Sequence, residues 1–102
     1  MSVSTVSAAE GGLSVTLPAI SDKVSTFRTY HAVAFIEQSG VTISGERQVT
    51  GTTLRNGMSL LVPGAFNTAN AVYLQVHVSE SDSGEVLFQE RKRECKVGPA
   101  ST

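Results

Sequence analysis

Apolar and polar residues alternate along several short segments of the chain, and a period of two residues is typical of half-buried β-strands. In residues 72–79 every even position is Val or Leu, whereas the odd positions are Tyr73, Gln75, His77 and Ser79. Residues 13–17 alternate in the same way and end at Pro18, which stops a strand or places it at a sheet edge. Both segments are therefore predicted to be strands with one buried face.

Residues 26–38 form the longest apolar segment and allow two interpretations. A helix is conceivable, because Ser21 could cap its beginning and Gly40 could close its end. The β-branched and aromatic residues of the segment favour a strand instead, and the segments on both sides also read as sheet. We therefore predict a strand.

This strand is unusual because both of its faces are apolar. Tyr30, Ala32, Ala34 and Ile36 would lie on one side, and His31, Val33 and Phe35 on the other. A sheet with one solvated face alternates apolar and polar residues. Three explanations remain open: another protein chain covers the second face, the protein's own arm or a loop covers it, or the segment is not a strand.

The remaining segments complete an all-β pattern. Residues 41–44 read as a strand with Gly45 as a possible bulge, and Asn56-Gly57 predicts a tight hairpin between residues 52–55 and 58–62. Phe66 is expected to anchor the loop at 64–70. A polar turn at 80–84 leads into the last strand, residues 85–95.

About seven strands with turn signals every eight to twelve residues predict a single small antiparallel β-sandwich, immunoglobulin-like or jelly-roll-like. We expect one domain over residues 1–102, with 1–11 as an N-terminal arm outside the core and 98–102 as a C-terminal tail.

The composition mainly excludes certain classes of binding partner. Charged residues make up 17% of the 102 residues and the net charge is −1, so neither a nucleic acid nor an anionic membrane is an expected partner. The chain has 13 Ser, 10 Thr and 13 Val, which suits a pleated sheet whose surface needs little desolvation. The first twenty residues contain no signal peptide as numbered, so we expect a virion or cytoplasmic location unless a leader was removed.

Candidate chemistry is sparse. Cys95 is the single cysteine, so no internal disulfide can form and its role stays open. His31 and His77 with Cys95 are too few for a structural zinc site, which takes four ligands. We find no nucleotide-binding or nucleophile motif, and predict no catalytic residue, no cofactor and no metal. The carboxylates at 80, 82 and 85 indicate a solvated turn, with a weak Ca²⁺ site as the alternative.

Arg91-Lys92-Arg93 is the one basic run of the chain. On a regular strand Arg91 and Arg93 would point one way and Lys92 the other. A nucleic-acid platform would add stacking aromatic residues and a positive face, and both are missing. A charged edge strand that discourages sheet-to-sheet aggregation is the favoured interpretation, with a charge-complementary protein contact as the alternative.

Residues 72–89, VYLQVHVSESDSGEVLFQ, form a closing hairpin that is similar in rhythm to the last hairpin of the curli-system amyloid inhibitors. Bacteriophage head-decoration and fibre modules and immunoglobulin-like surface domains also look similar in outline. The resemblance implies a small β-sandwich accessory protein. Curli inhibitors are exported, and the N-terminus here shows no export signal.

We therefore expect a non-enzymatic structural or assembly protein that acts through contacts with other protein subunits, as a homo-oligomer or in a particle. A bacteriophage virion component such as a capsid, decoration or fibre module is the leading hypothesis. The alternative is a monomeric immunoglobulin-like binding module, or a bacterial extracellular aggregation inhibitor that acts by β-strand pairing. The interface candidates are His31, Val33, Phe35, Tyr73, His77, Arg91 and Arg93.

Overall fold

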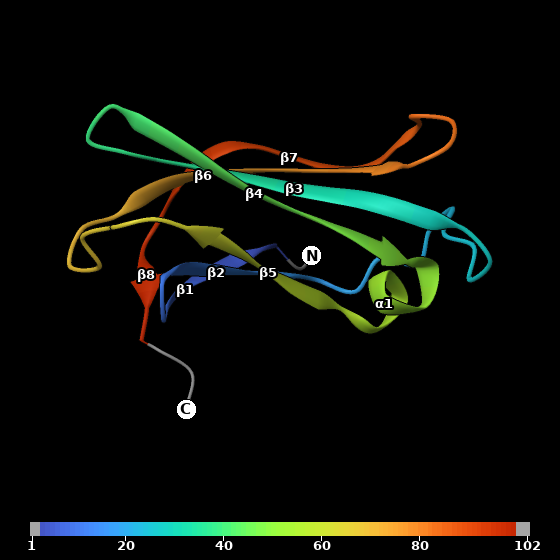
Figure 1. Cartoon of the computed structure of the whole chain (residues 1–102), viewed down its shortest axis with the longest axis horizontal. Coiled ribbons are helices and arrows are strands. Elements are labelled where there is room, and N and C mark those ends of the chain that lie inside the picture. Colours follow the sequence, from blue (N-terminus) through green and yellow to red (C-terminus); the bar gives the residue numbers. More distant parts are fainter. Residues whose placement is uncertain (1–2, 100–102) are drawn as a thin grey trace.

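The computed structural model describes residues 3–99 and consists of two four-stranded sheets stacked in two layers (Figure 1). One sheet has the order β5-β2-β1-β8 and the other the order β4-β3-β6-β7. Neighbouring strands are antiparallel except for β1 and β8, which are parallel. The elements are β1 (Thr5–Ala9), β2 (Gly12–Leu17), β3 (Thr29–Gln38), β4 (Val41–Thr50), α1 (Gly51–Asn56), β5 (Met58–Pro63), β6 (Val72–Glu80), β7 (Val86–Cys95) and β8 (Val97–Gly98). The predicted all-β class is thus confirmed.

The core lies between the layers and is built from the alternating positions of the long strands. The four aliphatic residues at the even positions of β6, from Val72 to Val78, are fully buried, as the alternation predicts. Residues 29–38 are a strand and not a helix, and Tyr30, Ala32, Ala34 and Ile36 form its buried side. Leu13, Val15, Leu17, Leu60 and Val62 face them from the other sheet. Phe66 packs half-buried against this core.

The prediction that residues 1–11 form an arm outside the core is wrong for the part that the structure describes. Residues 5–9 are β1, an inner strand between β2 and β8, and Val6 is buried in the core. In the sequence this segment resembles a tail because its residues are small and polar. In the structure the same small side chains suit an inner strand that lies close to its neighbours. At the other end, Gly98 belongs to β8, so the predicted tail 98–102 begins inside the sheet. Residues 100–102 and 1–2 lie outside the described residues.

The predicted Asn56-Gly57 hairpin is also wrong, because residues 51–56 form the short helix α1. Thr50 caps its N-terminus by accepting a hydrogen bond from the Thr53 N–H at 3.4 Å. Leu54 is fully buried, and Gly57 closes the helix at φ +90°. Both a hairpin turn and a helix C-terminus use a residue at positive φ, so the Asn-Gly signal fits either structure. The helix leads the chain from one sheet to the other (Figure 1).

The two layers are joined along both long sides. On one side β4 crosses β5, where Gly45 lies so close to the Leu61 carbonyl that a Cβ atom would not fit. Gly45 therefore permits a close approach of two strands; it pairs in register with Ala34 and forms no bulge. On the other side β7 continues into β8 of the opposite sheet. Within residues 3–99, the helix α1 is too short and too polar to span a membrane.

Candidate interaction surface

One outer surface of the molecule is formed by the side chains of the sheet β4-β3-β6-β7 that point away from the core. We call it the Phe35 face. The register of β3 with its two neighbours places on it His31, Val33, Phe35, Glu37, Thr42, Ser44, Glu46, Gln48, Tyr73, Gln75, His77 and Ser79. These are the residues that alternate with the core positions of the same strands. Five of them, His31, Val33, Phe35, Tyr73 and His77, are interface candidates predicted from the sequence.

The apolar residues of the Phe35 face are partly open to solvent. Phe35 is 37% exposed and Tyr73 is 44% exposed, and Val33 is half-buried beside them. Val33 lies opposite His77 across the strand pair, and Phe35 lies opposite Gln75. The N-terminal segment pairs into the other sheet and does not cover this surface. The sequence left three explanations open for the strand with two apolar faces. The structure excludes the one in which this segment is not a strand. Among the described residues, no segment covers the Phe35 face.

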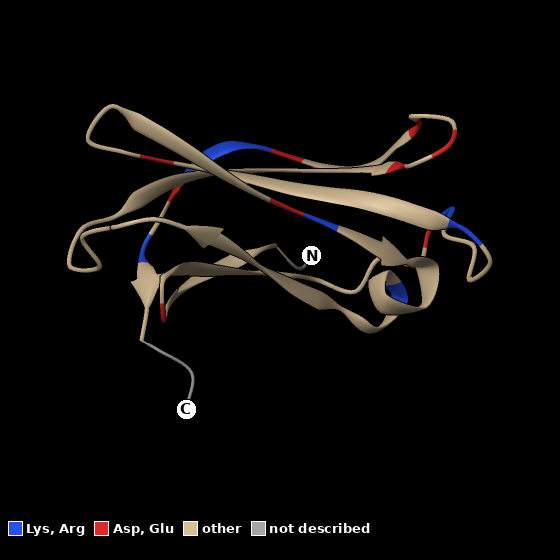
Figure 2. Ribbon diagram, viewed as in Figure 1, with Lys and Arg blue, Asp and Glu red and all other residues tan. Residues whose placement is uncertain are grey.

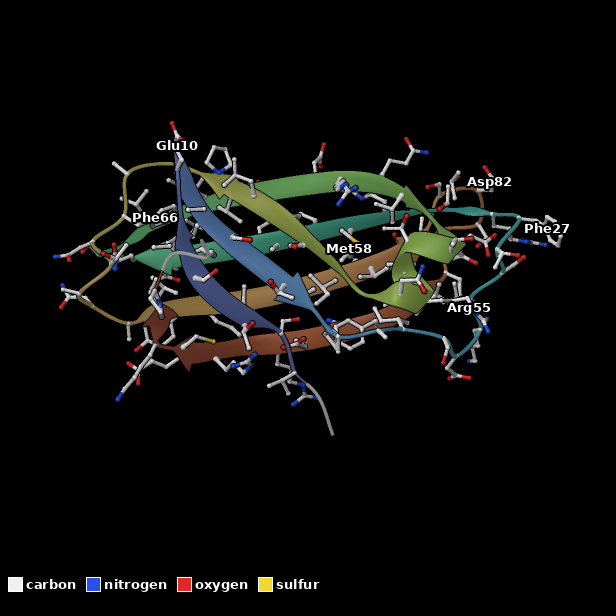
Figure 3. The ribbon with its side chains drawn as sticks, turned by 90° about the horizontal axis from the view of Figure 1, so that it is seen from below. Glu10, Phe27, Arg55, Met58, Phe66 and Asp82 are labelled. Atoms are coloured by element: carbon white, nitrogen blue, oxygen red, sulfur yellow. The ribbon has the colours of Figure 1, made fainter. Side chains whose placement is uncertain are left out.

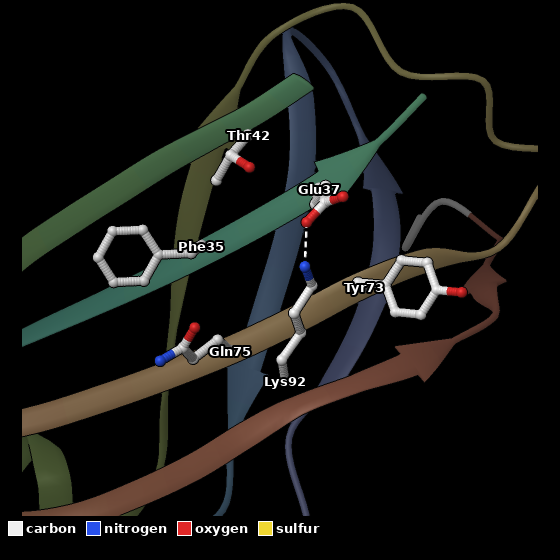
Figure 4. Close-up of a pocket in the computed structure, with 6 residues that line it drawn as sticks. All are labelled: Phe35, Glu37, Thr42, Tyr73, Gln75 and Lys92. Carbon is white, nitrogen blue, oxygen red and sulfur yellow. Dashed lines mark hydrogen bonds and ion pairs between the residues drawn. The ribbon is translucent and has the colours of Figure 1, made fainter. Parts of the chain in front are cut away.

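A hollow of about 120 Å³ lies in the Phe35 face and is lined by residues of all four of its strands (Figure 4). It is lined by Phe35, Glu37, Thr42, Tyr73, Gln75 and Lys92. Aromatic rings stand on two of its sides, and polar groups form the others. A concave site with apolar walls and a few oriented polar groups is suited to receive a side chain of another molecule.

Lys92 of β7 closes the rim of the hollow. Its ammonium pairs with the Glu37 carboxylate and lies 5.6 Å from the centre of the Tyr73 ring, within the range of a cation–π interaction. Lys92 and Glu37 were not among the candidates drawn from the sequence. Glu37 could have been found from the alternation of β3, whereas the position of Lys92 depends on an irregularity of β7 that the sequence does not signal.

Both histidines lie on the Phe35 face, as expected from their strands. His31 Nε2 lies 3.1 Å from a carboxylate oxygen of Glu46 on the neighbouring strand, and both side chains are well exposed. His77 sits beside Val33. Among residues 3–99 no three His, Cys, Asp or Glu side chains come together as a metal site would need.

The acidic turn after β6 does not gather its carboxylates. Glu80 is buried and turns toward Arg28, whose Nη1 lies 2.7 Å from its carboxylate oxygen. This ion pair raises the pKa of the Arg28 guanidinium. Glu80 therefore holds the loop before β3 against the end of β6.

The two arginine candidates on β7 separate in the structure. The pairing of β6 with β7 shifts between Leu74 and Val76, so that Arg91 and Arg93 do not follow a regular alternation. Arg93 is paired with Leu74, an inward position, and its guanidinium bonds Glu90 at 3.0 Å and the Ser4 carbonyl. Arg91 is exposed. The expectation that Arg91 and Arg93 share one face rests on a regular strand and is wrong.

A second surface, on the opposite sheet, contains no charge. The strands of the sheet β5-β2-β1-β8 carry no Lys, Arg, Asp or Glu, as Figure 2 shows. We call its outward side the Leu61 face, after Leu61, which is 46% exposed. Its other members include Thr5, Ser7, Ser14, Thr16 and Ser59. It has hydroxyl groups and one large apolar side chain.

Comparison with known proteins returned no match among protein families, curated proteins or solved structures.

Proposed function

We propose that the protein is non-enzymatic and acts by contact with other protein subunits through the Phe35 face. One observation carries the proposal: an outward sheet face on which Phe35 and Tyr73 stand partly open around a hollow. Interface centres are enriched in aromatic residues and depleted of charge, and Phe35, Val33, Gln75 and His77 make such a centre. The charged side chains flank this centre: Glu46 lies opposite Val33 on β4, and Glu37 and Lys92 pair at the hollow.

We further propose that the two layers are a β-sandwich of immunoglobulin-like topology. The order β4-β3-β6-β7 has the arrangement of the C′-C-F-G sheet of such domains, and β1, β2 and β5 have that of strands A, B and E. Domains of this architecture serve many cell-surface and assembly roles, so topology supports a contact function without naming a partner.

The uncharged Leu61 face supports an assembly role in particular. A subunit of a larger structure needs more than one contact surface, and a sheet without charged residues costs little to desolvate. The hypothesis of a virion component, as a capsid, decoration or fibre module, stays a prediction within this proposal.

The alternative mode of action, capture of a strand at a sheet edge, finds less support. The edge strand β7 has two register irregularities and the run Arg91-Lys92-Arg93, both of which discourage pairing with another strand. The edge strand β4 crosses β5, and Arg47 of β4 donates a hydrogen bond to the Ser59 carbonyl at 3.0 Å. Contact through faces is therefore favoured over contact through edges.

The test compares two exposed phenylalanines. Phe35→Ser removes the central aromatic of the Phe35 face, and Phe27→Ser makes the same change at a loop residue that is 97% exposed and points away from the sheets at one end of the molecule (Figure 3). Each tagged variant is expressed in the source cells, complexes are fixed with a chemical cross-linker before lysis, and the size of the complex that contains the variant is measured by gel filtration of the extract.

We expect the wild type and Phe27→Ser to elute in a complex larger than the monomer, and Phe35→Ser to elute as a monomer. We also expect Phe35→Ser to unfold at nearly the wild-type urea concentration. If Phe35 were a fully buried core residue, the substitution would instead lower the free energy of unfolding by about 3 kcal/mol or more. A wild type that elutes as a monomer, or a complex that survives Phe35→Ser, would contradict the proposal.

A further inference from the structure

We propose that the partner on the Phe35 face is a second copy of this chain, bound face to face about a two-fold axis. The inference rests on the proposed function and specifies its partner. A two-fold interface is isologous, so the same patch must be complementary to itself. The Phe35 face meets this condition because it holds both a partly exposed ring, Phe35, and beside it a hollow that can take a ring.

The ring and the hollow are neighbours on the same face. Phe35 forms one wall of the hollow, and Tyr73 stands on another side of it (Figure 4). A two-fold axis that passes between Phe35 and the hollow therefore brings each Phe35 ring over the hollow of the other copy. An apolar cavity of about 150 Å³ takes a whole benzene molecule. The hollow measures about 120 Å³, is open to solvent and has polar groups beside its two aromatic walls, so it accepts part of a phenyl ring packed against those walls.

One ion pair of the face lies at the hollow itself. Glu37 and Lys92 both line the hollow and pair with each other across it. The central residues Val33, Phe35 and Gln75 carry no charge. A ring of the second copy therefore meets no unpaired charge in the hollow, because the Glu37 carboxylate and the Lys92 ammonium there neutralise each other.

The area of the face suffices for a weak dimer. Neighbouring strands lie about 4.8 Å apart, so four strands are about 19 Å wide. β3 and β6 pair over eight residues, from Tyr30 to Glu37, which at about 3.3 Å each is about 26 Å. Two such faces bury roughly 1,000 Å² in total, near the lower limit for a specific interface. We expect a dissociation constant in the micromolar range or weaker.

The experiment is sedimentation equilibrium of the purified protein alone, over a concentration range from micromolar to millimolar. Four proteins are compared: the wild type, Phe35→Ser, Phe27→Ser as the matched change outside the face, and Leu61→Ser as the matched change on the opposite sheet. We expect a monomer–dimer equilibrium for the wild type. Phe35→Ser weakens it at least tenfold, because the ring is lost on both sides of the interface, whereas Phe27→Ser and Leu61→Ser leave it within about twofold.

Each other outcome overturns the inference. A wild type that is monomeric at millimolar concentration excludes the second copy. A dimer that survives Phe35→Ser but is lost in Leu61→Ser places the contact on the Leu61 face. If the purified wild type is monomeric while the complex in the cell extract still requires Phe35, the inference fails and the proposed function stands with a different partner. If neither assembly forms, both fail.

Discussion

Ser4 donates two hydrogen bonds to one carboxylate oxygen of Glu90, from its backbone N–H at 3.0 Å and from its hydroxyl group. The two residues lie at opposite ends of the chain and in different layers, Ser4 just before β1 and Glu90 on β7. Ser4 is 1% exposed, and the Glu90 side chain is 10% exposed. This contact, with the Arg93 guanidinium beside it, closes the layers on the side away from β4 and β5.

Glu90→Ala should therefore destabilise the fold more than a typical surface substitution. It leaves the two Ser4 donors without their acceptor and removes the carboxylate that pairs with the Arg93 guanidinium, and a hydrogen bond to a charged group contributes about 1.5–3 kcal/mol. We expect the free energy of unfolding in urea to fall by about 2–3 kcal/mol.

The matched control is Glu94→Ala, which changes an exposed carboxylate on the same strand and should alter the free energy of unfolding by less than about 0.5 kcal/mol. Equal effects of the two substitutions would mean that the Ser4–Glu90 contact adds nothing to stability, and that the N-terminal segment is held by β1 pairing alone.

The helix α1 offers a second test, because sequence and structure disagree there. Thr50→Ala removes the N-cap acceptor of the Thr53 N–H, and loss of such a cap costs about 1 kcal/mol. Thr52→Ala changes an exposed residue inside the helix, where alanine is the better helix former, and should be neutral or slightly stabilising. Both are measured by urea unfolding. If residues 52–55 were the strand of a hairpin, Thr52→Ala would be the destabilising change.

The sequence predicts most where a pattern of period two runs for many residues. The alternation over β6 and the strand β3 with its two apolar faces predict the class of fold, the core positions of these strands and five members of the Phe35 face: His31, Val33, Phe35, Tyr73 and His77. Each such strand is long enough that burying its even positions outweighs any local preference.

The failures occur where the outcome depends on contacts between distant segments. Residues 5–9 are too small to show a hydrophobic pattern, and their place in the sheet comes from pairing with β2 and β8. Asn56-Gly57 fits a hairpin and a helix end equally, and the burial of Leu54 selects the helix. The irregular pairing of β7 turns Arg93 inward, and no residue of the basic run indicates this irregularity in the sequence.

Cys95 gives the protein a pH-dependent stability. Burial raises the pKa of its thiol above the usual value near 9.0, and the Arg93 guanidinium offsets this only in part. The unfolded chain thus loses the thiol proton at a lower pH than the folded protein, so the free energy of unfolding falls as the pH rises from about 9 toward the folded pKa. Cys95→Ala cannot lose this proton. We expect the stability difference between wild type and Cys95→Ala, measured by urea unfolding at about pH 7.5 and about pH 9.5, to shrink at the higher pH; a difference that stays constant would show that the thiol titrates alike in both states.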